Sequence, residues 1–273
     1  MKEVVVAGVP FLVQPAAGRC PVLLLHGFVG HPSSWSEVVA RLGHASLAAP
    51  FLPGHDGYPG WFRGSRFEEV VDALAAALPL LSPQGWHVAG YSLGARVGLA
   101  LVVRYPERFQ GATLIGVRPG LRSAAERKER READARWVQL LRTAGLAAFL
   151  DAWEQQPLFA SQQALPPARR AAQRAVRQRH SAEGLARCLE VLGLAEMPDL
   201  WPALPHIQVP VRLVVGARDT AFWAVANEML ASLPRGELAV VPDAGHNVVL
   251  EAPAAVARWL ASAAAAPGDE EVP

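Results

Sequence analysis

Short apolar runs alternate along the chain with longer amphipathic stretches. Six apolar runs predict buried strands, at residues 21–25, 45–48, 86–90, 112–115, 211–215 and 238–241. Five stretches with helical spacing of apolar residues lie between or after these runs, at 34–42, 67–78, 93–104, 221–233 and 253–263. In one of them the predicted buried face consists of Phe67, Val70, Val71, Leu74, Ala77 and Leu78. The alternation predicts an α/β fold with a mostly parallel central sheet and helices on both faces.

Two further apolar runs stand near the start of the chain, at 4–6 and 11–13, and Gly8 lies between them. We expect them to form an antiparallel hairpin at the edge of the sheet. The first fifteen residues contain a single Lys and a short apolar run that is broken by Pro10. We therefore expect no secretory signal peptide.

The alternation of strands and helices stops between residues 118 and 200, where the sequence is rich in Ala, Leu, Arg, Glu and Gln. We predict that this segment is a helical lid, inserted into a core made of 1–117 and 201–265. Residues 266–273 are expected to be a flexible acidic tail. The lid contains 14 of the 26 Lys and Arg residues but 10 of the 25 Asp and Glu residues, so its net charge is +4. These cations can either be a solvated helical face or surround a pocket for an anionic ligand.

Composition and charge argue against several classes of protein. The formal net charge of +1 gives no support to nucleic-acid binding, and no stretch of 18 apolar residues is present to span a membrane. Cys20 and Cys188 form neither a disulfide framework nor a zinc motif. No metal or cofactor motif of the type H-E-x-x-H or G-x-G-x-x-G occurs. The sequence predicts a reduced, cytoplasmic enzyme or binding protein that needs no cofactor.

The motif with the clearest chemistry is Gly90-Tyr91-Ser92-Leu93-Gly94, which follows a predicted strand and begins a predicted helix. This is the context of a nucleophile elbow, in which the central serine stands on a strained turn between strand and helix. The flanking glycines are needed because a Cβ atom at either position would collide with neighbouring backbone. Ser92 is therefore the candidate nucleophile or base.

A reactive serine requires a histidine and an orienting carboxylate. Asp219 follows one late predicted strand and His246 follows the next, which gives the chain order Ser…Asp…His of an α/β-hydrolase sheet. Asp243 is a second candidate for the carboxylate, although it lies in the same loop as His246. Four other histidines fit the site less well: His87 lies in a strand, His180 in the lid, and His31 and His44 are expected at the surface.

The sequence Leu25-His26-Gly27-Phe28 ends the first buried strand. A turn of this kind supplies one N–H of an oxyanion hole, here from Phe28, which is expected to pair with the N–H of Leu93. His26 can be read as a second base, but we favour a buried imidazole that holds the loop.

These motifs resemble the α/β-hydrolase superfamily over nearly the whole chain. Within it, the chain resembles the family of 2-succinyl-6-hydroxy-2,4-cyclohexadiene-1-carboxylate synthases of menaquinone biosynthesis. The narrower resemblance rests on LLLHGFVGHPSSW, LPGH, GYSLGAR, PGLRSAAERKERREADARW, DAWEQQPLF, GARDTAFW and DAGHNVVLEAP. It implies a lyase in which Ser92, prepared by His246 and Asp219, removes a carbon-bound proton from a cyclohexene, after which pyruvate leaves.

The resemblance also implies residues that bind the carboxylates of this substrate. They are Tyr91, Arg96, Arg130, Trp153 and Arg177. Arginine suits this role because its planar guanidinium binds carboxylates in a bidentate manner. Neighbouring arginines can be confused with two of them, namely Arg127 with Arg130, and Arg174 or Arg179 with Arg177.

Three features depart from the family pattern. Ala221 stands where a lysine is usual, Phe51 replaces an acidic residue, and the loop after LPGH carries the bulky residues Tyr58, Trp61 and Phe62. Two other functions remain open. One is a serine hydrolase that cleaves an ester, lactone or carbon–carbon bond through an acyl-enzyme, and the other is a ligand receptor without activity.

Overall fold

The computed structural model describes residues 1–16, 20–43, 45–56 and 66–264. Its centre is an eight-stranded sheet with the strand order β1-β2-β4-β3-β5-β6-β7-β8. The strands are β1 (Lys2–Val6), β2 (Val9–Gln14), β3 (Val22–Leu25), β4 (Leu47–Pro50), β5 (Trp86–Tyr91), β6 (Phe109–Ile115), β7 (Val211–Gly216) and β8 (Gly236–Val241). β1 and β2 form the predicted antiparallel hairpin at the edge, and the pairs from β4 to β8 are parallel.

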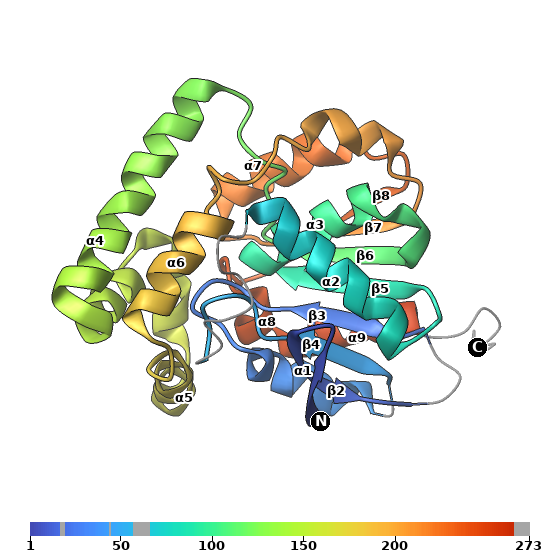
Figure 1. Cartoon of the computed structure of the whole chain (residues 1–273), viewed down its shortest axis with the longest axis horizontal. Helices are drawn as coiled ribbons and strands as arrows, with labels where there is room; N and C mark the ends of the chain where they lie inside the picture. The colour runs from blue at the N-terminus through green and yellow to red at the C-terminus, as the bar shows by residue number, and fades with distance from the viewer. Residues whose placement is uncertain (17–19, 44, 57–65, 265–273) are drawn as a thin grey trace.

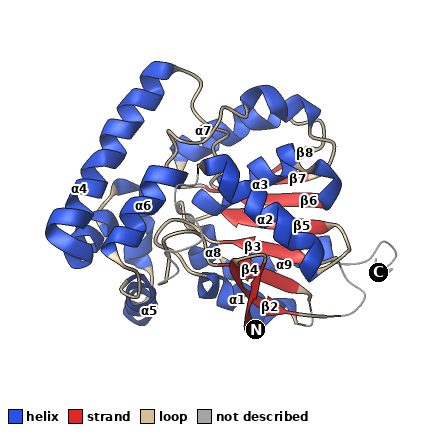
Figure 2. Ribbon diagram, in the orientation of Figure 1, coloured by secondary structure: helices blue, strands red, loops and turns tan. Residues whose placement is uncertain are grey.

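Helices cover both faces of the sheet, as predicted (Figures 1 and 2). The helices of the core are α1 (Ser36–Leu42), α2 (Phe67–Leu81), α3 (Leu93–Arg104), α7 (Thr220–Leu230), α8 (Val248–Glu251) and α9 (Pro253–Ala264). Among its described residues the core also contains three short 3₁₀ helices, η1 (Pro32–Trp35), η3 (Pro106–Arg108) and η5 (Trp201–His206). One apolar cluster combines α2, α3 and α7 with one face of the sheet, and a second combines α1, α8 and α9 with the other face.

Neighbouring residues of β3 illustrate why the strands are almost wholly apolar. Leu23 and Leu25 belong to the first cluster, whereas Val22 and Leu24 belong to the second. Successive side chains of a strand point to opposite faces, so a strand that is covered on both sides needs apolar residues at each position.

The segment between β6 and β7 contains helices α4 (Ala124–Glu154), η4 (Pro157–Ala164), α5 (Pro167–Arg177) and α6 (Ala182–Leu192), and no strand. These helices lie together at one end of the sheet (Figure 1). Gly145 interrupts α4 with a left-handed φ of 80°, so the element consists of two helical parts. We keep the name lid for residues 118–200. Leu141, Phe149 and Leu185 form a small apolar core inside it, which also includes Val29 of the sheet domain.

Several element boundaries differ from the prediction, among them the start of β6, at Phe109 instead of 112, and three of the differences have a clear physical cause. The fourth strand lies at Leu47–Pro50 instead of 45–48, because its pairing with β2 and β3 outweighs the weak strand preference of Ala49 and Pro50. Helix α2 continues through Pro79, and the carbonyl of Ala75, which Pro79 cannot hydrogen-bond, accepts from Arg108 Nη1 at 2.6 Å. Helix α7 ends at Leu230, since Leu233 precedes a proline and disfavours helical backbone.

No helix among the described residues is both long and apolar enough to cross a membrane. The predicted acidic tail, His44, and the aromatic residues Tyr58, Trp61 and Phe62 lie outside the described residues.

Candidate active site

Ser92 stands on the sharp turn between β5 and α3, with φ of 53° and ψ of −110°. A left-handed φ is strained for any residue other than glycine, as expected for a nucleophile elbow. The two flanking glycines are required for packing. A Cβ atom on Gly90 would come within 2.4 Å of the carbonyl oxygen of Gly94, and one on Gly94 within 2.2 Å of the carbonyl oxygen of Leu25. The turn therefore presses the start of α3 against the end of β3.

A hydrogen-bonded chain joins Ser92 to His246 and Asp219. Ser92 Oγ lies 3.0 Å from His246 Nε2, and His246 Nδ1 lies 2.6 Å from Asp219 Oδ2. The carboxylate accepts a hydrogen bond from Nδ1–H, which leaves Nε2 free to accept the proton of the serine hydroxyl. The competing carboxylate, Asp243, is 89% exposed and pairs with Arg218. The geometry therefore selects Asp219 over Asp243.

The backbone on either side of His246 is held by a single carboxylate. Glu251 accepts hydrogen bonds from the N–H groups of Gly245, at 2.8 Å, and of Asn247, at 3.2 Å. The phenyl ring of Phe222 lies 4.5 Å from the imidazole, measured between ring centroids. The position of the base is therefore fixed by both hydrogen bonds and packing.

Phe28 and Leu93, the residues predicted to supply the oxyanion hole, both line the cavity beside Ser92. Leu93 is the first residue of α3, and the first N–H groups of a helix have no partner within the helix. These groups also carry the partial positive charge of the helix dipole. The close packing of Gly94 against Leu25 brings the loop of Phe28 to this same helix end. The arrangement suits stabilisation of a developing negative charge.

The cavity has a volume of about 390 Å³ and is rich in arginine. Among the described residues, its charged lining consists of one carboxylate, Glu37, which pairs with Arg169, and five arginines: Arg96, Arg118, Arg130, Arg169 and Arg177. Arg96 comes from α3, one turn after Ser92, and donates to the carbonyl of Leu192 at 2.9 Å. Burial, together with the nearby charge of Arg130, lowers the pKa of Arg96 to about 10, so the guanidinium remains charged at neutral pH.

Arg130 and Arg177, the lid arginines predicted from the family resemblance, both line the cavity. Arg130 Nε lies 3.0 Å from both carboxylate oxygens of the buried Asp134. Arg177 is 6% exposed and donates to Glu154 at 2.9 Å. Each guanidinium is thus held in place by a carboxylate.

The neighbouring arginines that could be confused with these two make other contacts. None of the three is part of the described lining of the cavity. Arg127 donates to the carbonyl of Met197, Arg174 binds Glu154 and Asp151, and Arg179 binds Asp56. The structure therefore separates two alternatives that the sequence left open.

Trp153 and Tyr91 supply aromatic surface to the cavity. Trp153 packs edge-to-face with Phe28, with ring centroids 5.2 Å apart, and stacks on Phe149. Burial raises the pKa of the Tyr91 phenol well above its usual value, so the hydroxyl stays neutral and can donate a hydrogen bond.

Two cavity arginines were not predicted from the sequence. Arg169 lies on α5 and donates to the carbonyl of Leu250 at 2.9 Å. Arg118 follows β6, and ligand-binding residues of α/β sheets gather at the carboxyl ends of the strands, so its position could have identified it.

The expectation for His31 is wrong. It is 4% exposed rather than at the surface, because its Nδ1 accepts from the N–H of Ser33 at the start of η1 and its Nε2 lies 3.1 Å from Asp56. Its ring also lies 5.0 Å from that of Phe51, one of the predicted departures from the family pattern. The other departure, Ala221, is exposed at the start of α7.

No group of three or more potential metal ligands is found among the described residues.

Comparison with known proteins shows which families and structures this chain resembles. A family model described as the alpha/beta hydrolase family matches residues 22–259. The chain is 36% identical over 240 residues to the 2-succinyl-6-hydroxy-2,4-cyclohexadiene-1-carboxylate synthase of Enterobacter sp. (strain 638), covering 88% of this chain and 90% of that protein. It is 36% identical over 248 residues to the enzyme of the same name from Salmonella paratyphi C (strain RKS4594), covering 91% and 94%. Among solved structures it is similar to MenH from S. aureus, with a TM-score of 0.87, 25% identity and coverage of 92% and 96%.

Proposed function

Because this chain belongs to the alpha/beta hydrolase family, we propose that it is a lyase in which Ser92, His246 and Asp219 act as the catalytic triad. The reaction is the elimination of pyruvate from a polycarboxylate cyclohexene, with formation of 2-succinyl-6-hydroxy-2,4-cyclohexadiene-1-carboxylate. The relatives of that name, at 36% identity over most of the chain, support this choice. The observation that carries it is the lining of the cavity beside Ser92, to which the described residues contribute five arginines and one carboxylate, Glu37.

The structure of the product indicates where the proton is removed. Its succinyl ketone is attached to ring carbon 2, so the hydrogen on this carbon of the precursor is acidic. Ser92 Oγ takes this proton as its own proton passes to His246 Nε2, and Asp219 stabilises the imidazolium that forms. The electron pair left on carbon 2 is delocalised into the ketone as an enolate. The N–H groups of Phe28 and Leu93 stabilise that oxygen.

Collapse of the enolate completes the elimination. The enolate electron pair forms a double bond between carbons 2 and 3, the ring double bond between carbons 3 and 4 shifts to carbons 4 and 5, and the bond from carbon 5 to the enolpyruvyl oxygen breaks. The leaving group takes this electron pair as enolpyruvate and takes up one proton on its terminal carbon to become pyruvate, while His246 gives up the proton that it received and returns to its neutral form. Ser92 forms no covalent bond to the substrate in this sequence.

The arginines account for binding of the substrate, a small anionic carboxylate. Several carboxylates must be taken out of water, which is costly unless cations meet them. Arg96 donates to the carbonyl of Leu192 and not to a carboxylate, so this hydrogen bond does not neutralise its positive charge. Arg130 and Arg177 remain anchored to Asp134 and Glu154, which orients them towards the cavity.

A serine hydrolase is the second candidate. The chain is similar to a thermophilic esterase from Thermogutta terrifontis, with a TM-score of 0.79 and 25% identity, covering 97% of this chain and all of that one. The same Ser92, His246 and oxyanion groups can form an acyl-enzyme from an ester. The arginine-rich cavity favours the lyase, since a neutral ester has no carboxylate groups for these arginines to bind.

The test is a coupled assay for pyruvate with the enolpyruvyl cyclohexene as substrate. The proposal expects release of pyruvate by the wild-type enzyme and its loss in Ser92→Ala. Efficient cleavage of esters without pyruvate release would favour the hydrolase.

A further inference from the structure

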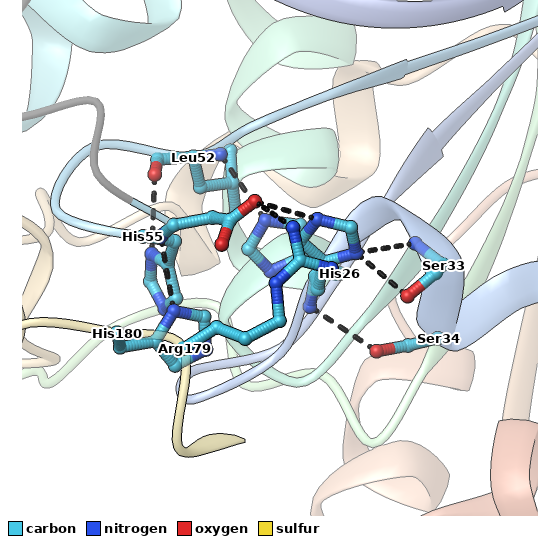
Figure 3. Close-up of polar contacts among 9 residues, drawn as sticks. His26, Ser33, Ser34, Leu52, His55, Arg179 and His180 are labelled. Carbon is cyan, nitrogen blue, oxygen red and sulfur yellow. Dashed lines mark hydrogen bonds and ion pairs between the residues drawn. The ribbon is translucent and has the colours of Figure 1, made fainter. Parts of the chain in front are cut away.

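Two loops at the carboxyl edge of the sheet are joined by a reciprocal pair of histidines. His26, after β3, accepts a hydrogen bond on Nε2 from the N–H of Leu52, after β4, at 3.1 Å. In return, His55 accepts on Nε2 from the N–H of Val29 in the first loop, also at 3.1 Å. The two rings pack edge-to-face with centroids 4.8 Å apart. Figure 3 shows His26, His55 and Leu52 gathered at this junction.

The other ring nitrogens fix the tautomer of both histidines. His55 Nδ1 lies 3.1 Å from the carbonyl oxygens of Leu52 and Pro53, and His26 Nδ1 lies 2.9 Å from the carbonyl oxygen of Gly27. A carbonyl can only accept, so each Nδ1 carries the proton and each Nε2 is an acceptor. Both side chains are buried, at 0% and 1% exposure. Burial lowers the pKa of His26 to about 3 and that of His55 well below its usual value, so both rings are neutral acceptors at pH 7.

The hydrogen bond from Val29 falls at a strained point of the chain. Val29 has a φ of 59°, which is unusual for a β-branched residue. It directly follows Phe28, whose N–H is the proposed donor to the enolate. A strained residue keeps such a conformation only when its surroundings hold it. The bond to His55 supplies part of that hold from the opposite loop.

The lid reaches the same junction through His180. Its ring lies 5.0 Å from that of His55, and its Nδ1 accepts from the N–H of Asp56 at 3.0 Å. Asp56 also pairs with Arg179 and His31. Figure 3 shows His180 and Arg179 beside His55. The loop that carries His55 is therefore fixed on one side by the sheet domain and on the other by the lid.

We propose that His55 is a positioning residue for the oxyanion hole: by accepting the N–H of Val29, it holds the strained turn that aims the N–H of Phe28 at the developing oxyanion. His55 does not line the described cavity and touches no reacting atom. The inference rests on the proposed function, because only that function makes the N–H of Phe28 a donor to the oxyanion.

The experiment compares His55→Leu, which removes the acceptor, with His55→Gln, whose amide oxygen can accept in place of Nε2. His55→Phe is a second variant without an acceptor, in case His55→Leu does not fold. His87→Leu is the matched control, because His87 is also a buried histidine with one side-chain partner, Thr113, but lies within β5.

We expect the acceptor-free variants to lower kcat for pyruvate release by about 10- to 100-fold, since small displacements of an oxyanion donor cost this much. KM should change by less than about 3-fold, because the arginines that bind the substrate are untouched. His55→Gln should recover part of kcat. Hydrogen–deuterium exchange should become faster in residues 26–31 of His55→Leu, and remain unchanged there in His87→Leu.

The outcomes separate this inference from the proposed function. A kcat for His55→Leu within about twofold of that for His87→Leu, or unchanged exchange in residues 26–31, overturns the positioning role. Failure of the wild-type enzyme to release pyruvate overturns the lyase, and His55 is then tested on turnover of an aryl ester, which also develops an oxyanion. If neither substrate reacts, unchanged exchange in 26–31 still overturns the inference, and faster exchange supports it.

Discussion

Glu251 fixes the backbone around His246, because its carboxylate accepts hydrogen bonds from the N–H groups of the two residues on either side of this histidine. The carboxylate lies outside the described lining of the cavity, so its contacts are with the backbone beside His246 and not with a molecule bound in the cavity. A histidine that shuttles a proton must keep its distance to both Ser92 and Asp219. This double hydrogen bond restrains the loop on which that distance depends.

Replacement of Glu251 by Ala should lower kcat by about 10- to 100-fold, the cost of a small misplacement of a catalytic group. The free energy of unfolding should fall by about 1–3 kcal/mol, because buried N–H groups lose their acceptor. KM should be nearly unchanged. Steady-state kinetics and urea denaturation measure these effects. Glu228→Ala is the control, since Glu228 is a half-exposed partner of Arg122 away from His246; equal kinetic losses in both variants would refute the role of Glu251.

The two aspartates near the base should respond very differently to loss of charge. Asp219→Asn should lower kcat by about 10³- to 10⁴-fold, because an amide favours the wrong tautomer of His246. Asp243→Asn removes only an exposed pair with Arg218, and should change kcat by less than about twofold. Equal activities of the two variants would contradict the assignment of Asp219.

Arg130 should matter for anionic substrates and not for neutral ones. Arg130→Ala removes a cation from the cavity wall and leaves the buried Asp134 without its partner, so an incoming carboxylate is also repelled. We expect KM for the polycarboxylate to rise by about 10- to 100-fold, the worth of a charged hydrogen bond. KM for an aryl ester should be unaffected. The control is Arg127→Ala, whose side chain binds the carbonyl of Met197; equal losses on both substrates would make Arg130 structural.

Buried histidines should make the protein sensitive to acid. Burial, with a smaller contribution from Arg212, lowers the pKa of His87 to about 4, below its unfolded value of about 6.5. Its contribution to stability is therefore complete above about pH 6.5 and is lost as the pH falls towards about 4, because the unfolded state binds the extra proton. Between these values the slope should be about 1 kcal/mol per pH unit for this residue. His26, His55 and His180 shift in the same direction.

Urea denaturation at pH 7, 6 and 5 tests this expectation. His87→Gln should be less stable than the wild-type protein at pH 7 but should lose less stability on acidification. A wild-type and a variant curve that run parallel would show that His87 titrates normally in the folded state.

The site residues that could be predicted from the sequence are those whose positions follow from the local pattern of strands, turns and helices. The strand-turn-helix pattern located Ser92, and the order of the last strands located Asp219 and His246, since the carboxyl ends of parallel strands meet at one edge. The sheet and its hairpin followed from the alternation of apolar runs in the same way.

What could not be predicted depends on contacts between distant segments. The bond from Val29 to His55 joins two loops whose pairing no local pattern encodes, and His31 is buried by Asp56 of the second loop. The same holds for helix α2, which continues through Pro79 because Arg108 reaches a carbonyl that the proline leaves unpaired. The lid boundaries at 118 and 200 remain a prediction.

The most direct test compares kcat/KM for pyruvate release from the enolpyruvyl cyclohexene with kcat/KM for hydrolysis of a simple aryl ester. It uses the wild-type enzyme and Ser92→Ala. The account predicts that the wild-type enzyme strongly prefers the cyclohexene and that Ser92→Ala loses at least about 10³-fold of this activity. Efficient ester hydrolysis without any pyruvate, or full pyruvate release by Ser92→Ala, would contradict it.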